Sequence, residues 1–275
     1  MPRYVLAVLF AILLPLAAQA AEIEVAPDSL APGDSFVIKV FGAEHKPLGL
    51  HEGGTLNFAP CGKGCYVAIG AVDLKRAPGA YGVDLSVEGE DIRVAIDVLP
   101  TEFPVVELTL PPGKVTPSPE DEERAEREAR MLRDLWSKAT GRLWQGGFIL
   151  PLENGLTTAF GVKRIMNKVK TSVHTGVDMR GMMGEAVRAA NRGRVVVAQE
   201  LFYGGNTVVL DHGQGIYTVY MHLSRFRVAV GDVVEKGDTV GEVGATGRAT
   251  GPHLHFSVKV GEASTNPVSF ARLPL

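Results

Sequence analysis

The chain has 275 residues, a net charge of −3 and a hydrophobic fraction of 45%. This length is typical of one large domain or two smaller ones, and the slightly acidic balance argues against a nucleic-acid partner, which usually requires a basic surface. The 32 glycines and 17 prolines favour short strands and tight turns over a helical bundle.

Residues 1–20 have the pattern of a secretory signal peptide. Arg3 supplies the positive charge, an apolar run follows, and Ala18-Gln19-Ala20 forms an A-x-A cleavage site. A membrane anchor is the alternative, but the apolar run is shorter than the roughly 20 residues that a spanning helix needs. We therefore expect export to a periplasmic or secreted location, without stable membrane insertion after cleavage.

Residues 22–111 alternate apolar and polar positions in short runs, of which the last is Val106-Leu108-Leu110. Turn-prone pairs such as Pro32-Gly33 separate the runs. This pattern predicts a mainly β fold and an immunoglobulin-like β-sandwich. The region offers no chemical constellation, and His45 and His51 are most simply surface histidines.

Cys61 and Cys65 are the two cysteines of the chain, in the string CGKGC. In an exported protein we expect such a pair to be oxidised, as a disulfide that closes a hairpin. A metal site is the alternative, but two ligands alone make a poor zinc site.

Residues 112–147 are expected to form a linker and an amphipathic helix. Ser118 has the features of an N-cap and Pro119 those of the first helical position. An apolar stripe at helical spacing predicts that the helix packs on a domain surface; the alternative is that the helix gates an active site. The stripe consists of Ala125, Ala129, Leu132, Trp136 and Ala139.

Residues 148–275 return to short strands between Gly-rich turns, which predicts an antiparallel β domain. Within it, alternation along a strand places His253 and His255 on one face and Leu254 in the core. The same parity places His174 and Asp178 on one face, although an ion pair at a turn is an alternative for these two. Tyr220 and His222 are expected to share a face.

These residues have the composition of a catalytic zinc site, which commonly has three protein ligands and one open position. His174, Asp178 and one histidine of the His253–His255 string supply three ligands, and the spacing leaves open which of the two histidines binds. His222 and the remaining histidine are suited to proton transfer beside the ion. His212 is expected to be structural or to support the site.

The stretch from Phe148 to Pro267 resembles the lysostaphin/LytM-type zinc metallopeptidases. The elements H-x-G-x-D, Y-x-H and G-P-H-L-H-F of that family occur here in the same order, as HTGVD, YMH and GPHLHF, framed by TTAFGVKR and Asn266-Pro267. The resemblance implies an antiparallel β fold with an open groove, and hydrolysis of peptide bonds in peptidoglycan stems or cross-links. D-alanyl–diaminopimelate cross-links are expected rather than glycine bridges.

The resemblance also implies a role for each site residue. His174, Asp178 and His255 would bind one zinc ion, and His222 and His253 would be the catalytic histidines. Asn206 stands where the family often has an asparagine near the site.

Two other functions compete with this one. A catalytically silent regulator of the same fold would bind the wall or activate amidases, but all the ligand and catalytic positions are present here. The string VGDVVEKGDTVGEVGA also resembles biotinyl and lipoyl carrier domains, yet its turns lack the lysine that such a domain needs.

Overall fold

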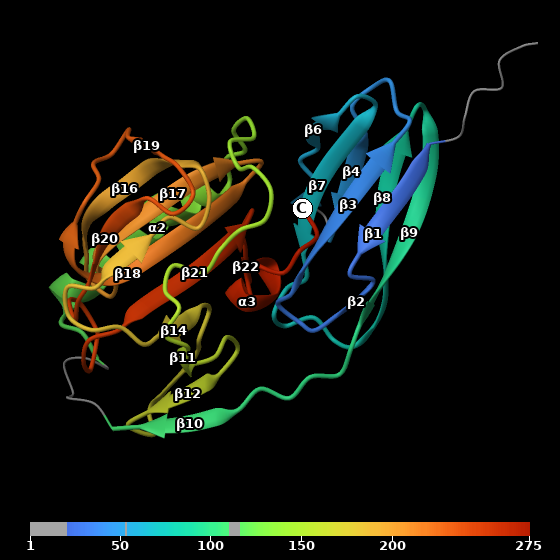
Figure 1. Cartoon of the computed structure of the whole chain (residues 1–275). Helices are drawn as coiled ribbons and strands as arrows, with labels where there is room; N and C mark the ends of the chain where they lie inside the picture. The colour runs from blue at the N-terminus through green and yellow to red at the C-terminus, as the bar shows by residue number, and fades with distance from the viewer. Residues whose placement is uncertain (1–20, 53, 110–115) are drawn as a thin grey trace, which may run out of the picture.

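The computed structural model describes residues 21–52, 54–109 and 116–275, so the predicted signal peptide lies outside the described residues. The chain forms two β-rich bodies that lie side by side (Figure 1). The prediction of a mainly β fold is confirmed. Among the described residues, no helix has the length and apolar content needed to cross a bilayer.

The N-terminal body consists of two sheets around one apolar core, which includes Phe36, Ile38, Val83 and Ile96. The strand orders are β1-β3-β7-β6 and β2-β9-β8-β4-β5. In chain order, the first sheet corresponds to the A-B-E-D sheet of an immunoglobulin-type sandwich, and β9-β8-β4 of the second sheet correspond to its G-F-C strands. The strands are β1 (Glu22–Ala26), β2 (Ser29–Leu30), β3 (Ser35–Phe41), β4 (Leu48–His51), β5 (Gly54–Thr55), β6 (Ala59–Gly62), β7 (Cys65–Ala71), β8 (Gly79–Val87) and β9 (Glu90–Val98).

The cysteines of this body form the predicted disulfide, Cys61–Cys65, which joins β6 to β7 across their turn. The prediction for the two histidines was right for one of them. His45 is exposed, but His51 is only 7% exposed and packs edge-on against the ring of Phe36. His51 is buried because alternation along β4 turns it toward the sandwich core.

The last predicted strand of the sandwich belongs to the other body. β10 (Val105–Leu108) leaves the sandwich and pairs in parallel with β12 (Lys163–Met166), which pairs in turn with β13 (Lys170–Val173). The placement of Val106 in the sandwich was therefore wrong. Alternating polarity identifies a strand, but it does not identify the sheet that the strand joins.

The C-terminal body is built on a ten-stranded antiparallel sheet, with the path β11-β14-β21-β18-β17-β16-β19. One face of this sheet supports the main core, which includes Phe256 and Tyr220. The elements are β11 (Leu156–Thr158), β14 (Val177–Met179), β15 (Ala186–Arg188), β16 (Gly193–Leu201), β17 (Gly205–Gly213), β18 (Ile216–Phe226), β19 (Val233–Val234), β20 (Thr239–Val243), β21 (Leu254–Val260), β22 (Ala263–Thr265) and α3 (Pro267–Phe270).

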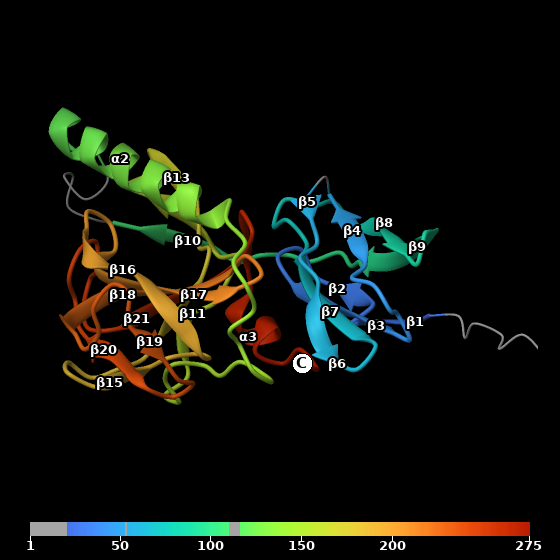
Figure 2. The same cartoon turned by 90° about the horizontal axis from the view of Figure 1, so that it is seen from above.

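Helix α2 (Pro119–Trp136) packs on the opposite face of that sheet (Figure 2). Ser118 caps it as predicted, accepting a hydrogen bond from the backbone N–H of Asp121. Trp136 is the buried anchor, against the ring of Tyr217, and the helix ends there, before Ala139. The prediction of a surface-packed helix is confirmed, and its possible gating role stays a prediction.

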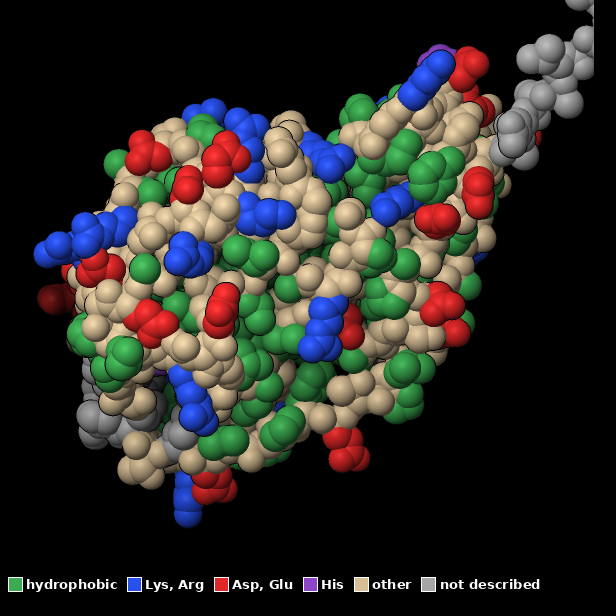
Figure 3. Space-filling model, viewed as in Figure 1, with side chains coloured by type: hydrophobic (Ala, Val, Ile, Leu, Met, Phe, Trp, Pro, Cys, Tyr) green, Lys and Arg blue, Asp and Glu red, His purple; other side chains and the backbone are tan. Residues whose placement is uncertain are grey.

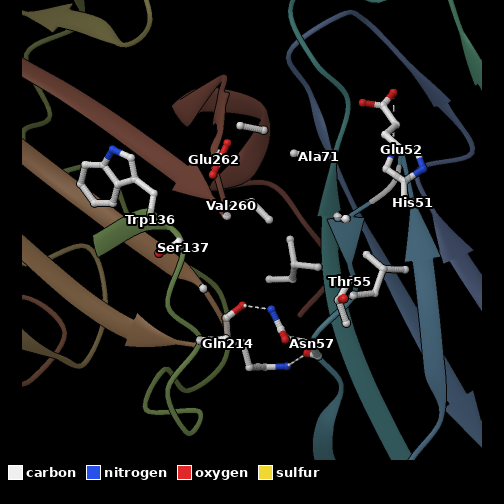
Figure 4. A pocket seen from close by; sticks show the side chains of 18 of the residues that line it. His51, Glu52, Thr55, Asn57, Ala71, Trp136, Ser137, Gln214, Val260 and Glu262 are labelled. Carbon is white, nitrogen blue, oxygen red and sulfur yellow. Dashed lines mark hydrogen bonds and ion pairs between the residues drawn. The ribbon is translucent and has the colours of Figure 1, made fainter. Parts of the chain in front are cut away.

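The two bodies meet across a cleft of about 890 Å³, with Trp136 on one wall and Thr55 on the other (Figure 4). Gln214 bridges the bodies: its side-chain amide donates to the carbonyls of Asn57 and Val67. None of the predicted zinc-site residues lines this cleft. On the face in Figure 3, acidic and basic side chains are intermixed, in keeping with the small net charge.

His212 lies in the core of the C-terminal body as part of a chain of buried polar groups. Its Nδ1–H donates to the carbonyl of Arg192 (2.8 Å), and its Nε2 lies 2.7 Å from the hydroxyl of Thr218. The Thr218 hydroxyl contacts that of Tyr220, which accepts a hydrogen bond from the N–H of Ala190. His212 is therefore structural, and burial lowers its pKa from 6.5 to about 4.

This histidine should make the protein acid-sensitive. A histidine that is neutral when folded and has its pKa lowered contributes stability above its unfolded pKa of 6.5, and this stability is lost as the pH falls toward about 4. The difference corresponds to about 3 kcal/mol. In urea unfolding between about pH 7 and pH 4, we expect wild type to lose that much more stability than His212→Gln, which cannot titrate. Parallel losses in the two proteins would contradict the prediction.

Candidate metal centre

Sheet pairing brings the predicted ligands together. β14 and β21 are neighbours, and Asp178 lies directly opposite His255. Directly opposite residues of an antiparallel pair point to the same face. The flanking residues Val177 and Leu254 are fully buried in the core, as alternation predicts, so Asp178 and His255 project from the other face. Helix α2 packs farther along this same face.

The donor atoms of three residues converge at one point. His174 Nε2, Asp178 Oδ1 and His255 Nδ1 lie 2.9 Å from one another in every pairing. A zinc ion with bonds of about 2.0 to 2.2 Å to nitrogen and oxygen can reach all three atoms. This is the one such group of three histidine, cysteine or acidic side chains among the described residues.

The hydrogen bonds around these residues orient lone pairs toward that point. The Ala159 carbonyl can only accept, so Nδ1 of His174 donates to it (2.8 Å), and Nε2 of the neutral ring has no proton. The other ring nitrogen of His255, Nε2, is 2.8 Å from the Ser257 hydroxyl. Lone pairs that face each other at 2.9 Å repel unless a cation lies between them. The donor set of two imidazoles and one carboxylate fits zinc.

The two oxygens of the Asp178 carboxylate have different partners. Its Oδ1 faces the imidazoles, while its Oδ2 accepts a hydrogen bond of 2.6 Å from Arg164 Nη2. Burial by itself raises the pKa of Asp178, but the hydrogen bonds and positive charge that His174 and His255 offer when protonated lower it well below its ordinary range. The Arg164 guanidinium also pairs with the ionised carboxylate, which is the form that a metal ligand requires.

A β-bulge turns His222 toward the centre. Asn206 pairs with Leu223 and Val208 with Tyr220, so two residues of β18 stand against one of β17. His222 is the bulged residue and adopts a left-handed backbone conformation, φ 65°. The prediction that Tyr220 and His222 share a face was wrong: Tyr220 is fully buried in the core. Bulges are common beside active sites because they re-aim a side chain in this way.

His222 and His253 form a second pair beside the three donors. Their ring centroids are 4.8 Å apart, and His253 Nε2 is 3.9 Å from Asp178 Oδ1. Each ring donates Nδ1–H to a backbone carbonyl, His222 to Thr246 and His253 to Gly251, which leaves Nε2 of the neutral ring as an acceptor.

The environment of His222 keeps it neutral. Burial, together with the positive charges that His253 and His255 have when protonated, lowers the pKa of His222 to about 4. Its Nε2 therefore has no proton near neutral pH.

Several residues of this centre have no distinguishing signal in the sequence. Arg164 was only part of a framing string, and Thr246 had no signal, because a backbone carbonyl is available at every position. Asn206 lies near the centre but does not contact the donors: its N–H donates to the Thr246 hydroxyl, and its side-chain amide is 3.5 Å from the carbonyl of Ser224.

Gly176 allows the loop between the first two donors to lie against β21. A Cβ at this position would be 2.5 Å from the carbonyl oxygen of Phe256 and 2.4 Å from the hydroxyl of Ser257. It would also be 2.8 Å from His255 Nε2. The glycine in HTGVD is therefore required by close packing.

Comparisons with known proteins agree with this geometry. The model of Peptidase family M23 matches residues 172–267, which confirms the resemblance seen in the motifs. A solved structure from Pseudomonas aeruginosa, assigned to peptidase M23, superposes with a TM-score of 0.68 at 25% identity. It covers 88% of this chain and 94% of that chain, so the likeness extends into the N-terminal sandwich.

Curated relatives match the C-terminal body. The DD-carboxypeptidase/endopeptidase Mpg of Neisseria meningitidis is 38% identical over 48% of this chain and 31% of its own length. The peptidoglycan DD-endopeptidase ShyB of Vibrio cholerae is 40% identical over 32% of this chain and 20% of its own. The glycyl-glycine endopeptidase ALE-1 of Staphylococcus capitis is 43% identical over 34% and 26%. The chain thus spans about a third or less of the length of these relatives.

The packing at Gly176 is testable. Gly176→Ala should separate β14 from β21 and destabilise the protein by about 1 to 3 kcal/mol, the usual cost of overpacking. The matched control is Gly147→Ala, where an added Cβ meets nothing within 4 Å. Urea unfolding of both variants measures the difference, and equal stabilities would show that the loop relaxes freely.

Proposed function

We propose that this protein is a zinc-dependent endopeptidase that hydrolyses peptide bonds in peptidoglycan stems or cross-links, since residues 172–267 match Peptidase family M23. The main support is the convergence of three metal-ligand atoms that lie 2.9 Å apart. Beside them are two imidazoles whose Nε2 atoms are left as acceptors. The names of the relatives, peptidoglycan DD-endopeptidase and glycyl-glycine endopeptidase, support the substrate class.

In this proposal His174, Asp178 and His255 hold the ion. Bound zinc would polarise the scissile carbonyl and lower the pKa of a water molecule. Arg164 holds Oδ2 of Asp178 so that Oδ1 stays directed at the ion. The carbonyl of Ala159 does the same for the His174 ring, as such outer hydrogen bonds commonly do at metal sites.

His222 and His253 carry out the proton transfers. The Nε2 atom of His222 accepts a proton from the attacking water, and the bulge holds this ring toward the centre. His253 is partly exposed and lies closer to Asp178, so it can donate to the developing oxyanion or to the leaving amine. The carbonyls of Thr246 and Gly251 fix both rings in the tautomer that this exchange needs.

The proposed place of action is outside the cytoplasm, in the periplasm or the medium. Two features support it: the signal-like pattern of residues 1–20 and the Cys61–Cys65 disulfide, which persists in oxidising compartments. The silent-regulator alternative is less well supported, because a protein that only binds the wall has no need for converging donors and two oriented imidazoles.

Two substitutions separate the roles. His255→Ala should lose both zinc and activity, because it removes a donor. His253→Ala should keep about one equivalent of zinc and lose about 10²- to 10⁴-fold in rate, the usual contribution of general acid–base catalysis. His45→Ala is the matched control, an exposed histidine in the N-terminal body. Metal analysis of the purified full chain and mass analysis of peptides released from peptidoglycan give the two readouts.

The outcomes of these experiments distinguish between the proposed roles and functions. Equal zinc loss in His253→Ala and His255→Ala would reject the assignment of roles. Zinc binding without any peptide release by the wild-type protein would favour the silent regulator. Release that persists in a chelator would reject the metal.

A further inference from the structure

One arginine contacts the metal centre, and a second lies in the loop that holds the ring of His222. Arg164, on β12, is paired with the carboxylate of Asp178. Arg248 lies in the loop after β20, and its guanidinium carbon is 4.3 Å from the centroid of the Tyr203 ring. The backbone N–H of Arg248 also donates to the Tyr203 carbonyl (2.9 Å).

Arg248 has no anionic partner within the described part of the chain. The charged and ring groups that act on it are Tyr203 and the like charge of Arg164, and the residue is partly buried. Arg142, which also stacks on an aromatic ring, differs because it donates to the carbonyls of Trp144 and Pro60. Other arginines pair with carboxylates, as in Arg76–Glu52, Arg124–Glu128 and Arg227–Glu242.

The loop that holds Arg248 is tightly packed beside the catalytic pair. A Cβ on Gly247 would lie 2.2 Å from the backbone nitrogen of Gly205, so the two loops touch backbone to backbone. Thr246 accepts the Nδ1–H of His222, and its hydroxyl donates to the carbonyl of Leu223. Arg248 is only two residues farther on, which limits its Cα to about 7 Å from that of Thr246.

A partly buried charge without a counterion is costly, and stacking on an aromatic ring offsets only part of that cost. The positive charge of the nearby Arg164 increases the cost of burying the Arg248 charge. A guanidinium held in this way is suited to a planar anion, because its N–H groups match the two oxygens of a carboxylate. Since the loop lies beside His222, an anion bound there would belong to the substrate.

We propose that Arg248 binds a free carboxylate next to the scissile bond, so that the enzyme selects cross-links with this group. In a D-alanyl–diaminopimelate cross-link, the carbon attached to the scissile nitrogen bears a free carboxylate. A glycine bridge or a lysine side chain has none at that position. This inference rests on the proposed endopeptidase function and specifies its substrate.

The test uses the zinc-loaded full chain and two synthetic cross-linked peptides. One has the free carboxylate beside the scissile nitrogen, and the other has a primary amide in its place. We expect wild type to cleave the acid with a kcat/KM about 10- to 100-fold above that of the amide, the range of a lost charge-assisted hydrogen bond. Arg248→Gln should lose this preference, mainly through KM, and Arg248→Lys should recover part of it. Arg194→Gln, which removes an exposed charge on the far strand β16, should behave as wild type.

A binding measurement keeps this inference separate from the proposed function. Calorimetry with the uncleaved peptides on His253→Ala, with and without Arg248→Gln, should give tighter binding of the acid only where Arg248 is present. That result would support carboxylate recognition even if wild type cleaved neither peptide, an outcome that would reject the endopeptidase instead. Equal effects of Arg248→Gln on acid and amide, or equal binding of both peptides by the intact arginine, would overturn the inference.

Discussion

The centre depends on the antiparallel pairing of β14 with β21, which sets Asp178 opposite His255. Alternation buries Val177, Met179, Leu254 and Phe256 in the core on one face and directs Asp178 and His255 to the other face. A slip of one residue in either strand would bury a charged carboxylate in an apolar core, which is strongly unfavourable. The hydrophobic core therefore enforces the geometry of the site.

Around this pairing, backbone groups do most of the orienting. Carbonyls of Ala159, Thr246 and Gly251 each hold one histidine ring by its Nδ1–H. Such contacts require that loops far apart in the sequence pack closely together. Gly176 and Gly247 allow this, because a side chain at either position would clash with the neighbouring backbone. This arrangement requires buried polar groups, and it leaves the charge of Arg248 without an anionic partner among the described residues. Both features are energetically unfavourable, so a ligand that pairs with them can gain binding energy.

Much of the site could be predicted from the sequence. The parity of His253 and His255 and the cap at Ser118 follow from local geometry, which the chain itself specifies, whereas His174 lies in the loop before β14, where strand parity does not apply. Other features could not be predicted. The bulge at His222 arises from a mismatch between two strands, the pairing of β10 with β12 from a choice between two sheets, and the burial of His51 from packing against a partner far along the chain.

The sequence by itself determined the types of ligand, their order and the β character of both bodies, because these depend on residue identity and on the two-residue period of a strand. Only the tertiary structure decided that three donor atoms meet 2.9 Å apart, that Arg164 pairs with a carboxylate, and that Arg248 has no such partner among the residues that the structure describes. Those facts depend on contacts between residues remote in the chain, and no local pattern encodes such distances.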